Sequence, residues 1–538
     1  MTSPQATLFQ RRFLLSNWEW VLFGLCVFVA MPLSRGYGMA WDEAQHAIYG
    51  SYVWDYFRSG FQDMKWKTDI GGLYTYGTLF DLPSAIFHRT FADDLFEWRS
   101  FFMAAAGAFA IPAVAKIGRR LGGERVAIFS VASLLMMPQF VGQSFINCKD
   151  IPLATGVAWS VLGILMALEK PVLSRFCLLG VIFGLTLSVR VGGAMVGVFF
   201  VTGLIFCGVR SALRGSLAAD IKRSVTRRTA IGFVLTGLLT WTILVAFWPY
   251  AHQRPFWNPI ESFLQATAFP ISYPVQYMGQ NIGSAQLPWH YLPVMLFLTA
   301  PVFIALWVAV GLGIGVRSLW KQGREAGSER IFVILFWLIF PVVFVWIKKP
   351  NVYDGVRHFL FVLPAMALLA GLGAASAAAW LDRRKDLVGT VGAAATLALA
   401  APDLITLHPY QYVFYNVFAG DRQTLHERFE TDYWATSYRE VAKRLNREQT
   451  RAMRPLTVAV GLNELSASCF SHFAAKDMRV GLILGPAPGA TLPAEVDYYT
   501  AIPRYQMWKN FPTMPLYMEI RRNGVLLNTV RGREPSTP

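Results

Sequence analysis

The stretch that decides the fold is the apolar run WVLFGLCVFVAMPL (residues 20–33), followed closely by Trp41-Asp42-Glu43-Ala44-Gln45-His46. The apolar run is typical of a helix that crosses a membrane, and the polar stretch begins where the chain leaves the lipid. Ionisable residues are costly in or near a membrane, so two adjacent carboxylates and an imidazole indicate either a reaction centre or a gate. We favour the reaction centre.

The composition of the whole chain indicates a multi-spanning membrane protein. Apolar residues make up 54% of the sequence and charged residues 15%, and the mean hydropathy is +0.39. Soluble domains average about 25% charged residues. The net charge of +16 comes from short basic clusters between the apolar runs, a distribution that reports membrane orientation. Nucleic acid is therefore not an expected partner.

Apolar runs of about 20 residues, the length that crosses a bilayer as a helix, recur along the chain. They begin near residues 18, 100, 126, 152, 176, 191, 230, 291, 330, 358 and 386. Basic clusters fall in every second gap, which places the N-terminus in the cytoplasm and the C-terminal tail outside. The runs near 176 and 191 are separated only by Arg190. The pattern predicts a mostly α protein, a polytopic membrane helical bundle of about eleven spans.

The predicted organisation has two parts. Residues 1–402 form the transmembrane domain, with a large outward loop at about residues 35–99 whose aromatic residues are typical of interfacial helices. Residues 403–538 form a small extracytoplasmic α/β domain, because their apolar runs shorten to strand length. Its signals are strands near 456–462, 480–484 and 496–502, a hairpin turn at Asn523-Gly524, and a helix to about Arg451 that begins at a capping box of Ser437 and Glu440.

Two further segments of this tail carry aromatic residues. The stretch 408–416 is expected to lie on the membrane surface. Glu430, Asp432, Tyr433 and Trp434 are expected either to bind a sugar by stacking and hydrogen bonding or to pack the domain onto the bundle.

Polar residues collect in the segments predicted to face outward, where a helical bundle would bring them over one cavity. We assign Asp42, Glu43 and Asp150 as candidate catalytic residues. The candidate substrate-binding residues are His46, Lys149, Arg190, Tyr353, Asp354, Arg357 and His358.

These residue types suit the transfer of a group from a lipid-linked phosphate donor to a hydroxyl acceptor. A carboxylate takes the proton of the acceptor, and cations offset the charge on the departing phosphate. An Asp with a pKa of about 3.9 is a weak base, so we expect the aromatic surroundings to raise the pKa of Asp42. The planar guanidinium of Arg357 suits a phosphate, and His358 offers a further hydrogen bond.

Three motifs carry a resemblance to a known family. They are Asp42-Glu43 after the first span, Arg119-Arg120-Leu121-Gly122 after the second, and Asp150-Ile151-Pro152 in the next outward loop. Over about residues 15–380 the chain resembles the C-type glycosyltransferase superfamily and is similar to protein O-mannosyltransferases and lipid A aminoarabinose transferases. The resemblance implies an inverting transfer of sugar from a polyprenyl phosphate on the extracytoplasmic face. Asp42 then matches the family's catalytic base, and Asp150 its second acidic residue.

Several residues have a second interpretation. Asp42 and Glu43 also suit the start of an interfacial helix, and Asp150 also suits a helix N-cap. His46 either orients Asp42 or lies exposed at the interface, and Arg190 either contacts the donor phosphate or marks a helix turn. For the whole chain, the alternative to a glycosyltransferase is a secondary transporter, for which ionisable residues are expected near the membrane midplane. A binding or sensor module on a membrane base is a third.

The remaining expectations concern cofactors, partners and location. The cysteine spacing predicts neither a disulfide nor a zinc site, and a divalent cation held by Asp42, Glu43 and Asp150 stays open. The expected partners are a polyprenyl-phosphate sugar donor, a lipid, glycan or protein acceptor, and membrane lipids. We expect an integral protein of the bacterial inner membrane with its active site and C-terminal domain outside the cytoplasm.

Overall fold

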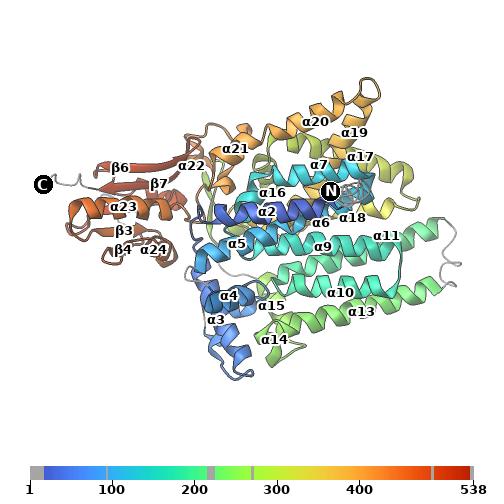
Figure 1. Ribbon diagram of the computed structural model, residues 1–538, viewed down its shortest axis with the longest axis horizontal. Helices are drawn as coiled ribbons and strands as arrows, with labels where there is room; N and C mark the ends of the chain where they lie inside the picture. The colour runs from blue at the N-terminus through green and yellow to red at the C-terminus, as the bar shows by residue number, and fades with distance from the viewer. Residues whose placement is uncertain are drawn as a thin grey trace, which may run out of the picture.

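The protein is a helical bundle with a small α/β unit at one end (Figure 1). The structure, a computed structural model, describes residues 17–68, 70–91, 95–214, 224–267, 272–485 and 490–532. The predicted fold class, mostly α with a small C-terminal sheet region, is confirmed.

Within the described residues, eight helical segments are long and apolar enough to cross a membrane, and two shorter apolar helices accompany them. The eight comprise α5 (Leu95–Ala108) with α6 (Ala110–Gly122), α9 (Asp150–Glu169), α11 (Met195–Leu213), α13 (Ser224–Ala246), α17 (Val302–Gln322), α18 (Ser328–Lys348), α19 (Leu363–Asp382), and α20 (Val388–Ala398) with α21 (Ala401–Thr406). The shorter two are α2 (Trp18–Ser34) and α10 (Leu173–Leu187). These ten correspond to ten of the predicted runs.

The remaining run, predicted near residue 126, forms the 12-residue helix α7 (Glu124–Leu135) followed by α8 (Pro138–Gln143). Met137 between them has an extended backbone (φ −89°, ψ 107°). A residue that precedes proline is disfavoured in the helical region, so Pro138 ends the run early. A helix of this length is shorter than the roughly 20 residues that a full span needs.

Two other chain breaks bear on the predicted spans. Arg190 is extended (φ −160°, ψ 139°) between α10 and a short 3-10 turn at Val191–Ala194, which confirms that the runs near 176 and 191 are separate helices. The run predicted near 291 is divided, because it begins as the short helix α16 (Tyr291–Leu298) and continues after Pro301 as the long helix α17. Proline lacks the backbone N–H that would continue a helix across this point.

The large loop of residues 35–99 folds into helices at the end of the bundle that carries the α/β unit (Figure 1). Its helices are α3 (Glu43–Arg58) and α4 (Asp81–Phe91). Tyr49, Tyr56 and Trp66 are buried in a small core of this loop, so part of its aromatic surface faces protein rather than lipid. Near this core lie α14 (Pro249–Gln253) and α15 (Asn258–Thr267).

The α/β unit is built on a five-stranded sheet with the order β4-β3-β5-β7-β6. Strand β3 is parallel to β4 and β5, and β7 is antiparallel to β5 and β6. The predicted hairpin is confirmed, because Asn523 (φ 47°) and Gly524 (φ 84°) both take the left-handed conformation of a tight two-residue turn. The elements are β3 (Thr457–Gly461), β4 (Arg479–Ile483), β5 (Tyr498–Ala501), β6 (Leu516–Arg522), β7 (Val525–Gly532), α23 (Tyr438–Ala452) and α24 (Glu464–Ser471).

Helix α23 is capped differently from the prediction. The helix is where the sequence places it, but the Ser437 side chain makes no capping hydrogen bond. The Asp432 carboxylate accepts instead from the backbone N–H groups of Thr436 (3.1 Å) and Ser437 (2.9 Å). Glu440 pairs with Arg444 and Arg522, so it is not the second half of a capping box.

The aromatic segment 408–416 does not lie on the membrane surface, contrary to the prediction. Tyr412 is fully buried, and its backbone carbonyl accepts from Gln139 Nε2 of α8 at 2.7 Å. The Asn416 amide donates to the carbonyls of Phe297 and Ala300. The segment therefore joins the α/β unit to the bundle. A hairpin of β1 (Pro274–Tyr277) and β2 (Gln280–Gly283) adds to this junction next to α22 (Leu425–Arg428), because Arg428 accepts a backbone hydrogen bond from the hairpin turn.

Substitution of Gly142 tests this junction. A Cβ atom at Gly142 would lie 2.4 Å from the backbone nitrogen of Tyr412. We expect Gly142→Ala to lower the free energy of unfolding by about 1–3 kcal/mol, as overpacking does, measured by thermal unfolding in detergent. Gly237→Ala is the matched control, because nothing lies within 4 Å of its Cβ position. Equal melting temperatures for the two variants would contradict the tight junction.

Candidate active site

Segments far apart in the sequence meet at the end of the bundle next to the α/β unit. Lys149 Nζ lies 2.5 Å from Asp42 Oδ2, which joins the start of α3 to the turn before α9. Arg190 pairs with Asp150, the first residue of α9. Arg357 also lies near Asp42, because its positive charge helps to lower the pKa of that carboxylate. The structure thus gathers polar residues from the loop of residues 35–99, from the turn before α9 and from residues 353–358, together with Arg190.

Asp42 and Lys149 form a partly exposed ion pair at the centre of this group. The exposed fractions of their side chains are 14% and 11%. Burial alone would raise the pKa of Asp42, but the positive charges of Lys149, His46 and Arg357 outweigh it and lower the pKa to about 2. The expectation of a raised pKa was therefore wrong, because the sequence did not reveal that a lysine would contact this carboxylate.

Asp150 is held from two sides and does not cap α9 with its side chain. Asn147 takes the capping role, since its Oδ1 accepts from the backbone N–H of Asp150 at 2.9 Å. The Asn147 amide also donates to Asp150 Oδ2 at 3.1 Å, and Arg190 pairs with Oδ1. The Arg190 guanidinium and Lys149 Nζ both lie over the ring of Tyr76, at 5.8 and 5.9 Å. Asp150 therefore sets the position of Arg190.

The loop 353–358 presents Arg357 on a tight turn in which Asp354 (φ 59°) and Gly355 (φ 63°) are left-handed. Asp354 is fully buried and its Oδ2 lies 3.0 Å from Arg357 Nη1. The Arg357 guanidinium lies over the rings of Tyr353 (4.9 Å) and Trp434 (4.6 Å). Its Nε donates to His358 Nε2 at 3.3 Å. Two aromatic rings and one hydrogen bond thus hold the guanidinium in place.

Glu43 and His46 lie in a separate buried network. Arg99 donates to Glu43 Oε2 at 2.7 Å and to Asp81 Oδ1 at 2.8 Å, and His46 Nδ1 lies 2.8 Å from Asp81 Oδ2. These side chains are at most 5% exposed. His46 therefore neither orients Asp42 nor lies exposed, contrary to both interpretations. The network ties α3 to α4 and α5 beneath the Asp42 pair.

Asp81 and Arg99 were not among the site residues predicted from the sequence. Both lie in the large outward loop, where charged residues are ordinary and give no signal of burial. Arg99 stands at the edge of the second apolar run, a position that suits interfacial anchoring as well as a buried pair.

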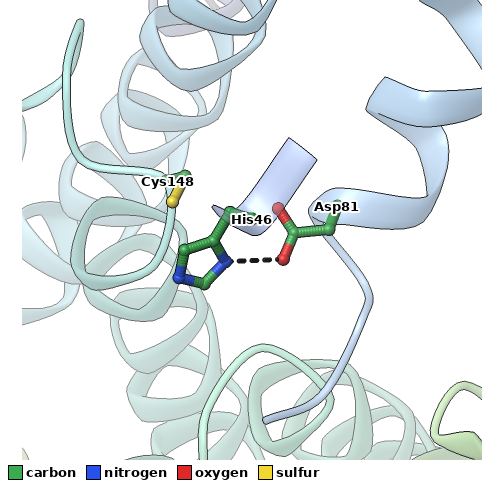
Figure 2. A group of neighbouring side chains, drawn as sticks. All are labelled: His46, Asp81 and Cys148. Atoms are coloured by element: carbon green, nitrogen blue, oxygen red, sulfur yellow. Dashed lines mark hydrogen bonds and ion pairs between the residues drawn. The ribbon is translucent and has the colours of Figure 1, made fainter. Parts of the chain in front are cut away.

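Two residues of this network, His46 and Asp81, lie beside the buried Cys148 (Figure 2). The atoms of these three residues that could bind a metal ion are within 4.8 Å of one another. In Figure 2 Asp81 lies on one side of the imidazole ring and Cys148 on the other. Both carboxylate oxygens of Asp81 are already bonded, and Arg99 would place a positive charge beside any cation. These residues fit an ion-pair network better than a metal.

The carboxylates suggested as ligands for a divalent cation do not share free oxygens either. Asp42 pairs with Lys149, Glu43 with Arg99, and Asp150 with Arg190. Hard cations need several oxygens that converge on one point, and these carboxylates instead each hold a separate cationic side chain.

The α/β unit contributes buried residues to the site around Asp42 and Arg357. Glu430, Asp432, Tyr433 and Trp434 are each at most 6% exposed, which agrees with packing onto the bundle rather than an open sugar site. Trp434 Nε1 donates to Gln143 Oε1 at 3.0 Å, and its carbonyl accepts from the Trp41 backbone N–H.

Part of the chain matches a known protein family. Residues 82–221, which include Arg99, Asp150 and Arg190, match the model of the dolichyl-phosphate-mannose-protein mannosyltransferase family. No curated protein matches the sequence.

Comparison with solved structures shows the same fold over most of the chain. ArnT from Cupriavidus metallidurans in the apo state is 14% identical, with 97% of this chain and 99% of ArnT covered and a TM-score of 0.51. The oligosaccharyltransferase AglB from Archaeoglobus fulgidus, in complex with an inhibitory peptide and a dolichol-phosphate, is 12% identical, with 91% and 70% covered and a TM-score of 0.53. The predicted resemblance and the predicted class, a membrane glycosyltransferase, are confirmed at the level of family model and fold.

Removal of Arg99 tests the buried network. Arg99→Met leaves Glu43 and Asp81 without their cation, and breaking a buried pair costs about 3–5 kcal/mol. Arg125→Met is the control, because Arg125 is 52% exposed in its pair with Asp382 and such a surface pair contributes about 0–1 kcal/mol. Thermal unfolding should separate the two variants by a large margin. A melting temperature for Arg99→Met equal to that of the control would show that the network contributes little.

Proposed function

We propose that the protein transfers a sugar from a polyprenyl-phosphate donor to a hydroxyl acceptor, with inversion at the anomeric carbon, on the extracytoplasmic face of the membrane. The observation that carries this proposal is a partly exposed carboxylate, Asp42, beside a cluster of cations formed by Lys149, Arg190 and Arg357. The match of residues 82–221 to a mannosyltransferase family supports it. So does the common fold with AglB, which was solved with a dolichol-phosphate.

The cation cluster supplies the donor-phosphate site. Lys149, Arg190 and Arg357 each face a different carboxylate, so their charges are balanced in the absence of a substrate. Arg190 is 21% exposed and Lys149 11%, which leaves both able to reach a ligand. A phosphate that enters between them gains charge-assisted hydrogen bonds, the strong class of such bonds. The rings of Tyr76 and Tyr353 keep the cations in place.

The chemical step is a single displacement. The acceptor oxygen attacks the anomeric carbon, and the bond from that carbon to the phosphate oxygen breaks as the new bond forms. The electron pair leaves with the polyprenyl phosphate, whose charge the cations offset. The proton of the acceptor hydroxyl passes to the Asp42 carboxylate. Attack on the face opposite the phosphate inverts the configuration.

Asp42 becomes a better base when the donor binds. While Lys149 contacts it, its pKa is held at about 2, which makes it a poor proton acceptor. The donor phosphate competes for Lys149, and loss of that neighbouring positive charge raises the pKa of the carboxylate. Glu43 and His46 support the step indirectly, by fixing the helix on which Asp42 stands.

The location follows from the charge pattern of the sequence. Basic residues between the apolar runs favour a site and a C-terminal unit outside the cytoplasm. We propose a bacterial inner membrane as the location. We keep 1–402 as the catalytic membrane domain and 403–538 as the extracytoplasmic domain. The acceptor is a lipid, a glycan or a protein.

The alternative of a secondary transporter has less support. In α9, α18 and α19 the charged residues stand at the helix ends rather than in the middle. Transporters place their coupling residues near the midplane, often on broken helices.

Replacement of Asp42 tests the base. We expect Asp42→Asn to lose sugar transfer by at least about 100-fold, the contribution typical of a general base, when purified protein is incubated with a panel of polyprenyl-phosphate sugars. Asp55→Asn on the same helix is the control, because Asp55 pairs with the exposed Arg89 away from the site. If Asp42→Asn transfers sugar at the wild-type rate, Asp42 is not the base.

Replacement of Lys149 tests how the basicity of Asp42 is set. The base works as a carboxylate, so the rate falls at low pH as Asp42 takes up a proton. Because the pKa of Asp42 is about 2, this fall occurs at pH values below those of ordinary assays. Lys149→Met removes the main positive charge that lowers this pKa. We therefore expect the acidic limb of kcat/KM against pH to move upward into the measurable range. Lys65→Met, at an exposed lysine of the same loop, should leave the profile unchanged; an unmoved limb in Lys149→Met would overturn the assignment.

A further inference from the structure

An arginine of the α/β unit reaches into the site. Arg504 follows β5 and its side chain is 2% exposed. Its Nη1 lies 2.6 Å from Asp354 Oδ1, and its guanidinium lies 4.6 Å over the ring of Trp41, the residue before the proposed base. The chain enters the 3-10 segment Arg504–Lys509 through two left-handed residues, Tyr505 (φ 53°) and Gln506 (φ 59°). Such backbone strain is tolerated where surrounding structure holds a residue in place.

One carboxylate is shared between this arginine and the proposed phosphate ligand. Asp354 offers Oδ1 to Arg504 and Oδ2 to Arg357. A carboxylate free of other partners prefers to take a guanidinium in a two-point, side-by-side pair. Arg504 lies on Oδ1, and Asp354 pairs with Arg357 from Oδ2 to Nη1. In our proposal Nη2 of Arg357 is the group that turns toward the phosphate.

Glu430 completes the group from the α/β side. Its Oε1 lies 3.9 Å from Arg504 Nε, and the residue is 6% exposed. Burial raises the pKa of Glu430 to about 7. Glu430 keeps Arg504 near Asp354, since the guanidinium then lies between two acidic groups.

We propose that Arg504 is a positioning residue of the transfer reaction, which keeps Arg357 oriented toward the donor phosphate by occupying one oxygen of Asp354. The α/β unit is then part of the donor site rather than a separate module. This inference rests on the proposed function. Without Arg504, Asp354 rotates onto Arg357 in a two-point pair and withdraws it from the phosphate.

The test compares Arg504→Met and Arg504→Lys with wild-type protein in steady-state transfer from a polyprenyl-phosphate sugar. We expect Arg504→Met to raise the KM for the donor by roughly tenfold or more, the loss typical of one misplaced charged hydrogen bond, and to leave the KM for the acceptor unchanged. Arg504→Lys keeps a positive charge on Asp354 and should recover part of the loss. Arg454→Met is the control, at an exposed arginine of the same unit that pairs with Asp497.

A double variant distinguishes positioning from structural support. In Asp354→Asn the carboxylate that would capture Arg357 is gone, so adding Arg504→Met should change the donor KM little further. Additive effects in the double variant would overturn the inference, as would an unchanged donor KM with a lower melting temperature in Arg504→Met. If Arg504→Met does not fold, the comparison is made with Arg504→Lys, for which an unchanged donor KM overturns the inference.

Binding of a polyprenyl phosphate without its sugar, measured by calorimetry, provides a readout that needs no turnover. Weaker binding in Arg504→Met and normal binding in Arg454→Met are expected; equal binding in both overturns the inference. Failure of the proposed function gives a different result, because wild-type protein would then transfer no sugar from any of these donors.

Discussion

The site depends on the rule that a charge removed from water must be paired. Asp42, Asp150 and Asp354 lie at the end of an apolar bundle, and each is paired with a different cation, Asp354 with Arg504 in addition to Arg357. The cost of burying an ionised group in a medium of low polarity is large, and only close pairing offsets it. The same pairing that allows these residues to be buried fixes where the cations stand. The proposed phosphate site is therefore formed before any phosphate arrives.

The sequence predicted the parts of this structure that depend on local patterns. Apolar runs of spanning length, the break at Arg190 and the Asn523-Gly524 turn each depend on a few neighbouring residues, and all are found. The 12-residue α7 shows the limit, because Pro138 interrupts a run that hydropathy alone would continue. The order of the spans also predicted that Asp42, Lys149 and Arg357 lie at one end of the bundle. When successive helices alternate in direction, every second connecting loop lies on the same side.

What the sequence could not give were pairings between distant residues. The depressed pKa of Asp42 depends on contact with Lys149, 107 positions away. The buried role of Arg99 depends on its meeting both Glu43 and Asp81. Arg504 had no local signal at all, because an isolated arginine after a strand is ordinary. Each of these requires a three-dimensional neighbour that no spacing along the chain reports.

The contact between Lys149 and Asp42 also bears on the order in which substrates bind in the proposed mechanism. Lys149 occupies the Asp42 carboxylate until the lipid phosphate draws the ammonium group away. The base is then free only in the complex with the donor, so the ion pair favours compulsory binding of the donor before the acceptor.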